Sequence, residues 1–188
     1  MNLSYVRRLN RRLLSINLPN WLTLLRIALT PVYLILLAYP SASGIPAFII
    51  FMIAALTDAL DGYLARKYHL TSDVGKFLDP VADKLFVLLP LIWFASRGVV
   101  SVWLVMLIAA RDLVISAFRM LGASRGIVLC ASALGKMKTV SQIALLGALT
   151  LSWGYTAQYI GAAAAVLTVA SAAEYIYRNR GILSMLKQ

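Results

Sequence analysis

Stretches of about 20 apolar residues recur along the sequence, and they constrain the fold more than any other feature. Each is long enough to cross the roughly 30 Å hydrocarbon core of a bilayer as a helix. Hydrophobic residues make up 61% of the 188 residues, which is too apolar for a soluble protein of this size. We therefore predict an all-α integral membrane protein with six transmembrane helices. The predicted spans cover about 21–39, 44–67, 74–96, 100–123, 131 or 134 to 153, and 155–177.

The segment before the first span predicts an amphipathic helix that lies in the headgroup region. Its apolar residues recur at helical spacing, with the arginines largely off that stripe: Leu3, Val6, Leu9, Leu13 and Ile16. We predict 1–19 as this interfacial helix, 20–180 as one transmembrane domain and 181–188 as a cytoplasmic tail. Asn20 is a candidate cap for the first span. A signal peptide is the alternative, but Arg26 within the apolar run and the spans that follow disfavour it.

The charge of the chain is strongly basic, with 18 Lys and Arg against 7 Asp and Glu. These charges separate the apolar spans, so we expect anionic lipid headgroups and phosphorylated substrates as partners, and no nucleic acid. Nearly all of them lie in the N-terminal arm, at 66–76, near 119–138 and in the tail, whereas the opposite side has Arg97 alone. The excess of Lys and Arg in cytoplasmic loops then puts both termini on the cytoplasmic side. We expect the inner membrane of a bacterium.

Five of the seven acidic residues lie within 58–83, between two strongly apolar stretches. A carboxylate near the hydrocarbon core costs about 2.5–3.5 kcal/mol on insertion scales, so it is expected to face the protein interior and have a task. Asp58 and Asp61 share one face of the second span, and Asp79 and Asp83 share one face of the third. The polar turn between these spans makes them antiparallel neighbours. A rise of about 1.5 Å per residue then puts Asp58 level with Asp83, and Asp61 level with Asp79.

Four carboxylates gathered in this way predict a metal site. Like charges in a medium of low dielectric constant would repel one another unless a cation lies among them. Carboxylate oxygens favour Mg²⁺, Mn²⁺ or Ca²⁺, and a zinc site has little material in a chain with one His and one Cys. Two divalent ions that share carboxylates can clamp a phosphoryl group, so we interpret the cluster as a metal–phosphate site. A cation transporter that uses the carboxylates as its ion site is the alternative from another class.

Basic residues inside the spans predict a phosphate pocket beside the acidic cluster. They are Arg26 in the first span, Arg111 and Arg119 in the fourth, and Lys136 and Lys138 at the start of the fifth. Any one of these side chains could instead extend to the membrane surface, although Arg111 lies near the middle of its span. Several cations beside a metal site are better explained by binding to phosphate oxygens. We expect Asp112 to be a structural partner of Arg111.

The acidic stretch follows the pattern D-x-x-D-G-x-x-A-R-x8-G-x-x-x-D-x-x-x-D, which resembles the signature of the CDP-alcohol phosphotransferase family. All eight defining positions are present: Asp58, Asp61, Gly62, Ala65, Arg66, Gly75, Asp79 and Asp83. The resemblance extends over most of the chain, through NLPNWLTLLRIALTP, LDPVADKL, ARDLVISAFRML and LGKMKTVSQ. These segments are similar to the members that join CDP-diacylglycerol to sn-glycerol 3-phosphate.

The resemblance implies an integral membrane enzyme of phospholipid synthesis that releases CMP. It implies that the four aspartates hold Mg²⁺ or Mn²⁺, with two ions in each active site, and that Asp83 acts as the general base. It also implies a CDP site, made by Asp61, Gly62, Ala65, Arg66 and Gly75. Members of the family are commonly homodimers.

The acceptor is less constrained than the reaction. An acceptor with a phosphate dianion requires a basic pocket, which Arg111, Arg119, Lys136 and Lys138 would supply, with Arg26 and Asn20 as further candidates. Glycerol 3-phosphate meets that requirement. Inositol phosphate, phosphatidylglycerol and serine stay open as alternative acceptors.

Overall fold

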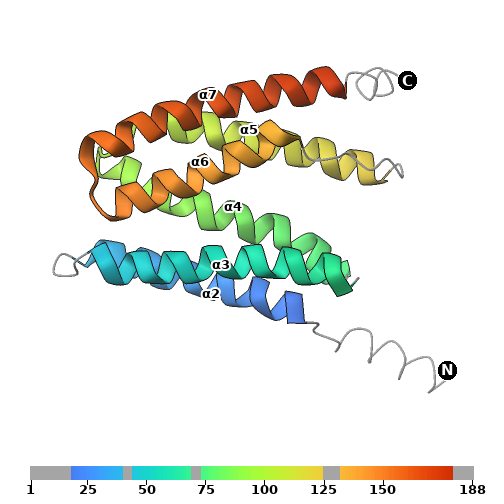
Figure 1. The fold of residues 1–188 in the computed structure, drawn as a ribbon, viewed down its shortest axis with the longest axis horizontal. Helices are drawn as coiled ribbons and strands as arrows, with labels where there is room; N and C mark the ends of the chain where they lie inside the picture. Colours follow the sequence, from blue (N-terminus) through green and yellow to red (C-terminus); the bar gives the residue numbers. More distant parts are fainter. Residues whose placement is uncertain (1–17, 40–43, 69–72, 125–131, 180–188) are drawn as a thin grey trace.

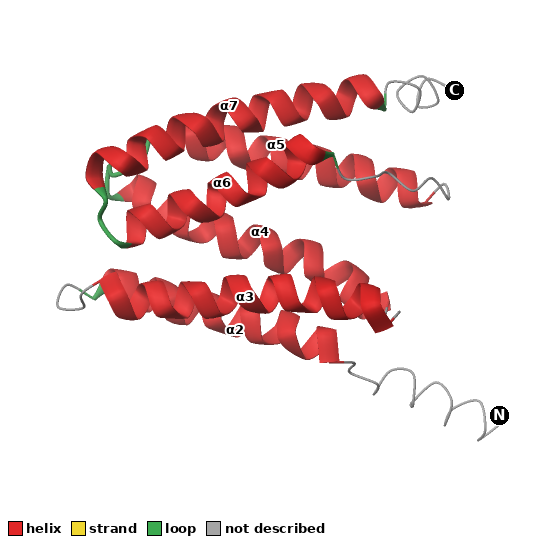
Figure 2. Ribbon diagram, viewed as in Figure 1, coloured by secondary structure: helices red, strands yellow, loops and turns green. Residues whose placement is uncertain are grey.

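The computed structural model describes residues 18–39, 44–68, 73–124 and 132–179. Its account of side chains leaves out 18–20, 59, 61–68, 73–77, 121 and 123–124. The described part of the chain is helical and contains no strand (Figure 2). The helices are α2 (Leu18–Ala38), α3 (Gly44–Tyr68), α4 (Asp73–Ser96), α5 (Val102–Ser124), α6 (Ala133–Thr150) and α7 (Gly154–Arg178). The all-α prediction is confirmed for these ranges.

Each helix matches one predicted span, with ends that differ by a few residues. The helix α2 begins at Leu18, so the prediction that Asn20 precedes and caps this helix is wrong. Backbone N–H groups in the first turn of a helix have no acceptor within the helix, so proline, which lacks an N–H group, is tolerated there. Pro19 can therefore lie inside the first turn, and the helix starts earlier than expected. Of the predicted interfacial helix at 1–19, residues 1–17 lie outside the described residues, and residues 18 and 19 belong to α2. The predicted tail at 181–188 also lies outside the described residues.

The helices form two groups that α4 joins (Figure 1). The helix α2 packs against α3 and α4, and α7 packs against α6 and α5. Contacts of α4 with α5 and α6, and of α3 with α6, connect the two groups. The start of α2 and the end of α7 lie at the same end of the bundle, as six alternating spans require (Figure 1).

Aromatic side chains fill the core between α2, α3 and α4. The rings of Phe51 and Phe86 stack with their centroids 5.4 Å apart, and Tyr33 packs on Phe51 at 5.6 Å. The buried hydroxyl group of Tyr33 shares a hydrogen bond of 2.5 Å with that of Thr150, at the end of α6. Aromatic pairs add to the energy of burial, so this cluster stabilises the contact between α3 and α4 just below the acidic residues.

The start of α3 lies very close to the end of α6. A Cβ atom added at Gly44 would lie 2.2 Å from the backbone carbonyl oxygen of Thr150. No side chain fits at that distance, so glycine allows the two helix ends to approach. This contact fixes α6, and its buried polar residues, relative to α3.

Of the helices that the structure describes, those at 21–38 and 154–178 are long and apolar enough to cross a membrane by length and composition. Large apolar side chains also cover the outside of the bundle. Examples are Ile35, Trp103 and Val166, which are 61%, 78% and 67% exposed. So much exposed apolar surface is unfavourable in water and favourable in contact with the hydrocarbon of a membrane.

Candidate active site

A polar cavity of about 270 Å³ lies between α3, α4, α5 and α6. It is at the end of the bundle that contains the start of α2 and the end of α3 (Figure 1). Its charged lining comprises Asp58, Asp79, Asp83, Lys84, Arg111, Asp112, Arg119 and Lys138. Three of the four predicted metal ligands and three of the five predicted phosphate-binding cations therefore face the same space.

Arg26 connects two of the predicted metal ligands. Its Nη1 atom lies 2.5 Å from Oδ1 of Asp58 and also forms an ion pair with Oδ1 of Asp83. One guanidinium nitrogen can contact both carboxylates only if they lie at a similar height, which agrees with the predicted alignment of Asp58 with Asp83. The Arg26 side chain is 1% exposed, so its charge is inside the protein and is stabilised by these carboxylates.

A second contact between α2 and α4 lies one turn away. The hydroxyl group of Thr23 donates a hydrogen bond of 2.5 Å to Asp79. Thr23 precedes Arg26 by one turn, as Asp79 precedes Asp83, so α2 and α4 run in the same direction here. The helix α2 therefore holds both Asp79 and Asp83 of α4 through polar side chains.

The carboxylates fit a divalent ion in chemical type, but their convergence on one ion stays a prediction. Among the side chains that the structure describes, no three from His, Cys, Asp and Glu lie close enough together to hold a metal. Asp61, the predicted fourth ligand, belongs to α3, and its side chain is outside the description. Arg26 supplies one positive charge to a group of acids that needs more than one.

Asp112 organises the cationic side of the cavity. Lys138 donates hydrogen bonds to both carboxylate oxygens of Asp112, at 2.6 and 2.8 Å. Nη1 of Arg111 donates to the same residue at 3.2 Å, as expected from their adjacency. The Asp112 carboxylate thus holds two cations from two helices, which compensates part of their mutual repulsion.

Arg119 and Lys136 are placed differently with respect to the cavity. Arg119 lines it, and its guanidinium carbon lies 5.9 Å from the ring centroid of Tyr175 on α7, a cation–π contact. Lys136 is exposed and does not line the cavity. Residues two apart on a helix point to different faces, so Lys136 cannot follow Lys138 inward. Its role in acceptor binding stays a prediction.

The predicted CDP-binding residues fall in the expected helices, without further detail. Residues 61, 62, 65 and 66 belong to the end of α3, and residue 75 belongs to the start of α4. Their side chains, like that of Asn20, lie outside the description. These residues lie within about two turns of Asp58 or Asp79, which line the cavity. The assignment of a CDP site to them therefore stays a prediction from the sequence.

The sequence interpretation missed several polar residues of the site. Thr23 and Gln142 were not singled out, and the pairing of Lys138 with Asp112 was not expected. Spacing could have indicated the first two, since Thr23 is three residues before Arg26 and Gln142 is four residues after Lys138. The pairing joins residues 26 positions apart, which no local pattern predicts.

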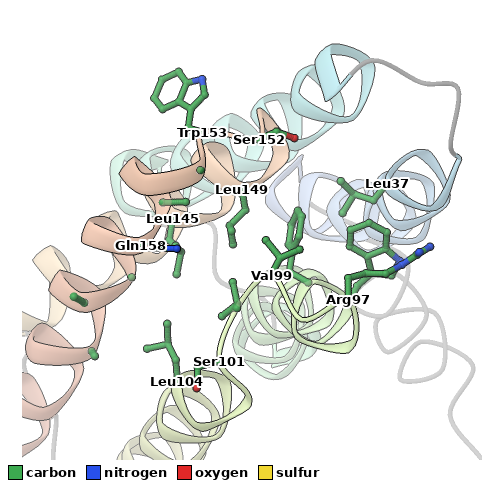
Figure 3. A pocket seen from close by; sticks show the side chains of 18 of the residues that line it. Leu37, Arg97, Val99, Ser101, Leu104, Leu145, Leu149, Ser152, Trp153 and Gln158 are labelled. Atoms are coloured by element: carbon green, nitrogen blue, oxygen red, sulfur yellow. The ribbon is translucent and has the colours of Figure 1, made fainter.

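A larger cavity, of about 820 Å³, lies at the opposite end of the bundle (Figure 3). Apolar residues such as Leu104, Leu145 and Leu149 dominate its lining. Arg97 is at its edge, and none of the described residues that line it is acidic. Its described lining offers no carboxylate for a divalent ion, so the predicted metal–phosphate site can be placed only in the smaller cavity.

The fold and the cavity define a class of helical, membrane-associated protein with a polar cavity lined by both carboxylates and cations. The sequence profile of the CDP-alcohol phosphatidyltransferase family matches residues 16–170. The chain therefore belongs to the CDP-alcohol phosphatidyltransferase family.

Three similar bacterial proteins carry the same name, CDP-diacylglycerol–glycerol-3-phosphate 3-phosphatidyltransferase. The protein of Bacillus subtilis is 40% identical over 148 residues, which cover 72% of this chain and 77% of the relative. That of Sodalis glossinidius is 36% identical and covers 89% of this chain and 97% of its own. That of Wigglesworthia glossinidia brevipalpis is 36% identical and covers 93% of each chain.

Proposed function

We propose that the protein transfers the phosphatidyl group of CDP-diacylglycerol to sn-glycerol 3-phosphate, which yields phosphatidylglycerophosphate and CMP. The observation that carries this proposal is the shared cavity. Carboxylates from α3 and α4 and cations from α5 and α6 line the same space, as a metal-bound pyrophosphate and an anionic acceptor would require. The names of the relatives support the same donor and the same acceptor.

Asp58, Asp61, Asp79 and Asp83 would hold Mg²⁺ or Mn²⁺, with two ions in each site. The donor set fits, because carboxylate oxygens are the ligands that these ions prefer. When bound, the ions would supply positive charge that stabilises the pyrophosphate and the departing CMP. Arg26 already neutralises part of the charge on Asp58 and Asp83, so it would keep the acidic residues in place before ions arrive.

Asp83 is our candidate for the general base. Its carboxylate would accept the proton of the 1-hydroxyl group of glycerol 3-phosphate. The hydroxyl oxygen would then attack the phosphorus that bears diacylglycerol, and the bond from this phosphorus to the CMP oxygen would break. CMP would leave with the electron pair of that bond. A positioned base contributes about 10²–10⁴-fold to rate, and alignment of the two substrates would supply much of the remainder.

Binding of the two substrates is divided between the two sides of the cavity. Gly62, Ala65, Arg66 and Gly75 would seat the CMP end, together with Asp61, at the adjoining ends of α3 and α4. The phosphate group of the acceptor would be bound by Arg111, Arg119 and Lys138, because they line the other side of the cavity, from α5 and α6. Asp112, which pairs with Arg111 and Lys138, would keep these two cations from pairing with the metal-binding aspartates. They would then stay available for the acceptor.

We further propose six membrane spans, a cytoplasmic active site in a bacterial inner membrane, and a homodimer. The six described helices and their exposed apolar side chains support the spans. The charge asymmetry of the sequence supports the orientation. The homodimer rests on the family resemblance, and cross-linking in native membranes would test it.

The assay for this function uses purified, detergent-solubilised protein, labelled CDP-diacylglycerol and a panel of acceptors. With Mg²⁺ or Mn²⁺, CMP release should be fastest with glycerol 3-phosphate and should stop when a chelator is added. Inositol phosphate, phosphatidylglycerol and serine form the rest of the panel. Faster release with any of these would overturn the acceptor, and no release with any alcohol would overturn the reaction.

A further inference from the structure

Gln142 is a buried polar residue that the proposed mechanism does not yet use. It lies on α6, its side chain is 1% exposed, and it lines the polar cavity. Its amide nitrogen Nε2 is buried and donates no hydrogen bond within the described part of the protein. A buried donor that lacks an acceptor is unfavourable, so such groups in a binding cavity are expected to meet a ligand or water.

The surroundings of Gln142 indicate an oxygen-rich anionic ligand. Lys138 is four residues earlier, hence on the same face of α6 and about 6 Å nearer the start of the helix. Nε of Arg111 is also buried without a hydrogen-bond acceptor, and Arg111 lines the same cavity from α5. Two helices therefore present unused donors beside cations, which is the chemistry that binds phosphate and hydroxyl oxygens.

We propose that Gln142 binds the acceptor, and that its Nε2 donates a hydrogen bond to a phosphate or hydroxyl oxygen of glycerol 3-phosphate. This inference rests on the proposed function. The acceptor is favoured over CDP-diacylglycerol because Gln142 shares one face of α6 with Lys138 and lines the same cavity as Arg111, both proposed to bind the acceptor phosphate, whereas the proposed CMP site is at the ends of α3 and α4. A neutral amide adds a directional donor without adding charge, so Gln142 would select the shape of the acceptor.

Two substitutions test the proposal through the KM of each substrate. Gln142→Met keeps the approximate length of the side chain and removes the amide, so the KM for glycerol 3-phosphate should rise about tenfold. The KM for CDP-diacylglycerol should change by less than about twofold. Gln142→Glu keeps the shape but adds a negative charge, so acceptor binding should weaken further, because the carboxylate repels phosphate.

The matched control is Gln158→Met, which makes the same change at the other end of the bundle. Gln158 is exposed at the edge of the apolar cavity, so both KM values should stay at the wild-type level. Thermal unfolding of each variant in detergent separates a folding defect from a binding defect. Unfolding near the wild-type temperature, together with a raised acceptor KM, supports the proposal.

An acceptor analogue without the 2-hydroxyl group, 3-hydroxypropyl phosphate, identifies the oxygen. If the effect of Gln142→Met vanishes with this analogue, Gln142 binds the 2-hydroxyl group; if it persists, Gln142 binds the phosphate, and either result supports acceptor binding. An unchanged acceptor KM, or equal increases for both substrates, would overturn the proposal and leave Gln142 a structural or water-binding residue. A wild-type protein that releases no CMP would instead refute the proposed function itself.

Discussion

Arg26 is almost fully buried, and its guanidinium group contacts two carboxylates from different helices. The acids would repel one another without a cation, and Arg26 would be strongly unfavourable without the acids. The carboxylates therefore make the burial of Arg26 tolerable, and Arg26 reduces the repulsion between the carboxylates. The arrangement also leaves excess negative charge, which is what a site for divalent ions needs.

Removal of this cation should destabilise the protein in a manner that depends on metal. Arg26→Met should lower the free energy of unfolding by about 1–3 kcal/mol, less than for a fully buried pair, because both aspartates are partly exposed. Thermal unfolding in detergent with chelator measures the loss. Added Mg²⁺ should restore part of it, since a second cation then neutralises the acids. An equal loss with and without Mg²⁺ would contradict the proposed metal site.

Arg119 should contribute to acceptor binding more than to donor binding. Arg119→Ala should raise the KM for glycerol 3-phosphate about tenfold or more, because a charged hydrogen bond to phosphate is lost. The KM for CDP-diacylglycerol should change little, and steady-state CMP release measures both. Arg97→Ala, at the opposite end of the bundle, is the control for loss of an arginine. Equal effects of Arg119→Ala on the two substrates would refute the phosphate pocket.

Local spacing predicted part of the residue-level geometry and could not predict the rest. The alignment of Asp58 with Asp83 follows from helical rise and one connecting turn, and Arg26 contacts both as that alignment requires. The contact with Arg26 itself joins residues 57 positions apart, so it depends on how α2 packs against α4. The same reason explains why Gln142 was missed, since its burial depends on how α6 packs against the other helices.

At the scale of helices, apolar length predicted the elements well, because each tract is bounded by polar or turn-forming residues. The ends were less accurate where side chains decide them. Ser132 caps α6 by accepting a hydrogen bond from the N–H of Gly135 at 3.0 Å. At the other end, α6 stops at Thr150 rather than at the predicted residue 153. Ser152, in the connection, and Gly154, the first residue of α7, adopt positive φ angles of 57° and 30°. Hydropathy contains no signal for such a break.

The close contact between α3 and α6 predicts a sharp difference between two glycines. Gly44→Ala should destabilise the protein by about 1–3 kcal/mol, because its Cβ atom would overlap the carbonyl oxygen of Thr150. Gly161→Ala is the matched control: its Cβ atom would lie 3.4 Å from a side-chain atom of Leu104, an ordinary contact. Thermal unfolding in detergent compares the two. A Gly44→Ala protein as stable as Gly161→Ala would show that the helix ends do not approach so closely.

For the molecule as a whole, alternating helices place the starts of α2, α4 and α6 at the end that carries the polar cavity. The apolar cavity is at the other end, about 16 Å away along α4, since Phe94 follows Asp83 by eleven residues. A polar end with cations and an apolar end with Arg97 are consistent with the proposed orientation, in which the polar cavity faces the cytoplasm and the water-soluble acceptor.

This orientation can be tested by labelling single cysteines with a membrane-impermeant maleimide. In a Cys130→Ser background, Ser101→Cys should react in intact spheroplasts, because it lies at the end opposite the polar cavity. Arg178→Cys, at the end of α7, should react only after the membrane has been permeabilised. Reaction of both cysteines from the same side of the membrane would contradict six alternating spans.

The most direct test of the central claim is the release of CMP from CDP-diacylglycerol by purified wild-type protein and by Asp83→Asn. We expect the wild type to release CMP only when both glycerol 3-phosphate and Mg²⁺ or Mn²⁺ are present. The rate of CMP release by Asp83→Asn should be lower by at least about a hundredfold. Near-normal release by Asp83→Asn would remove this carboxylate from the chemistry, and release independent of divalent ions would contradict the metal–phosphate site.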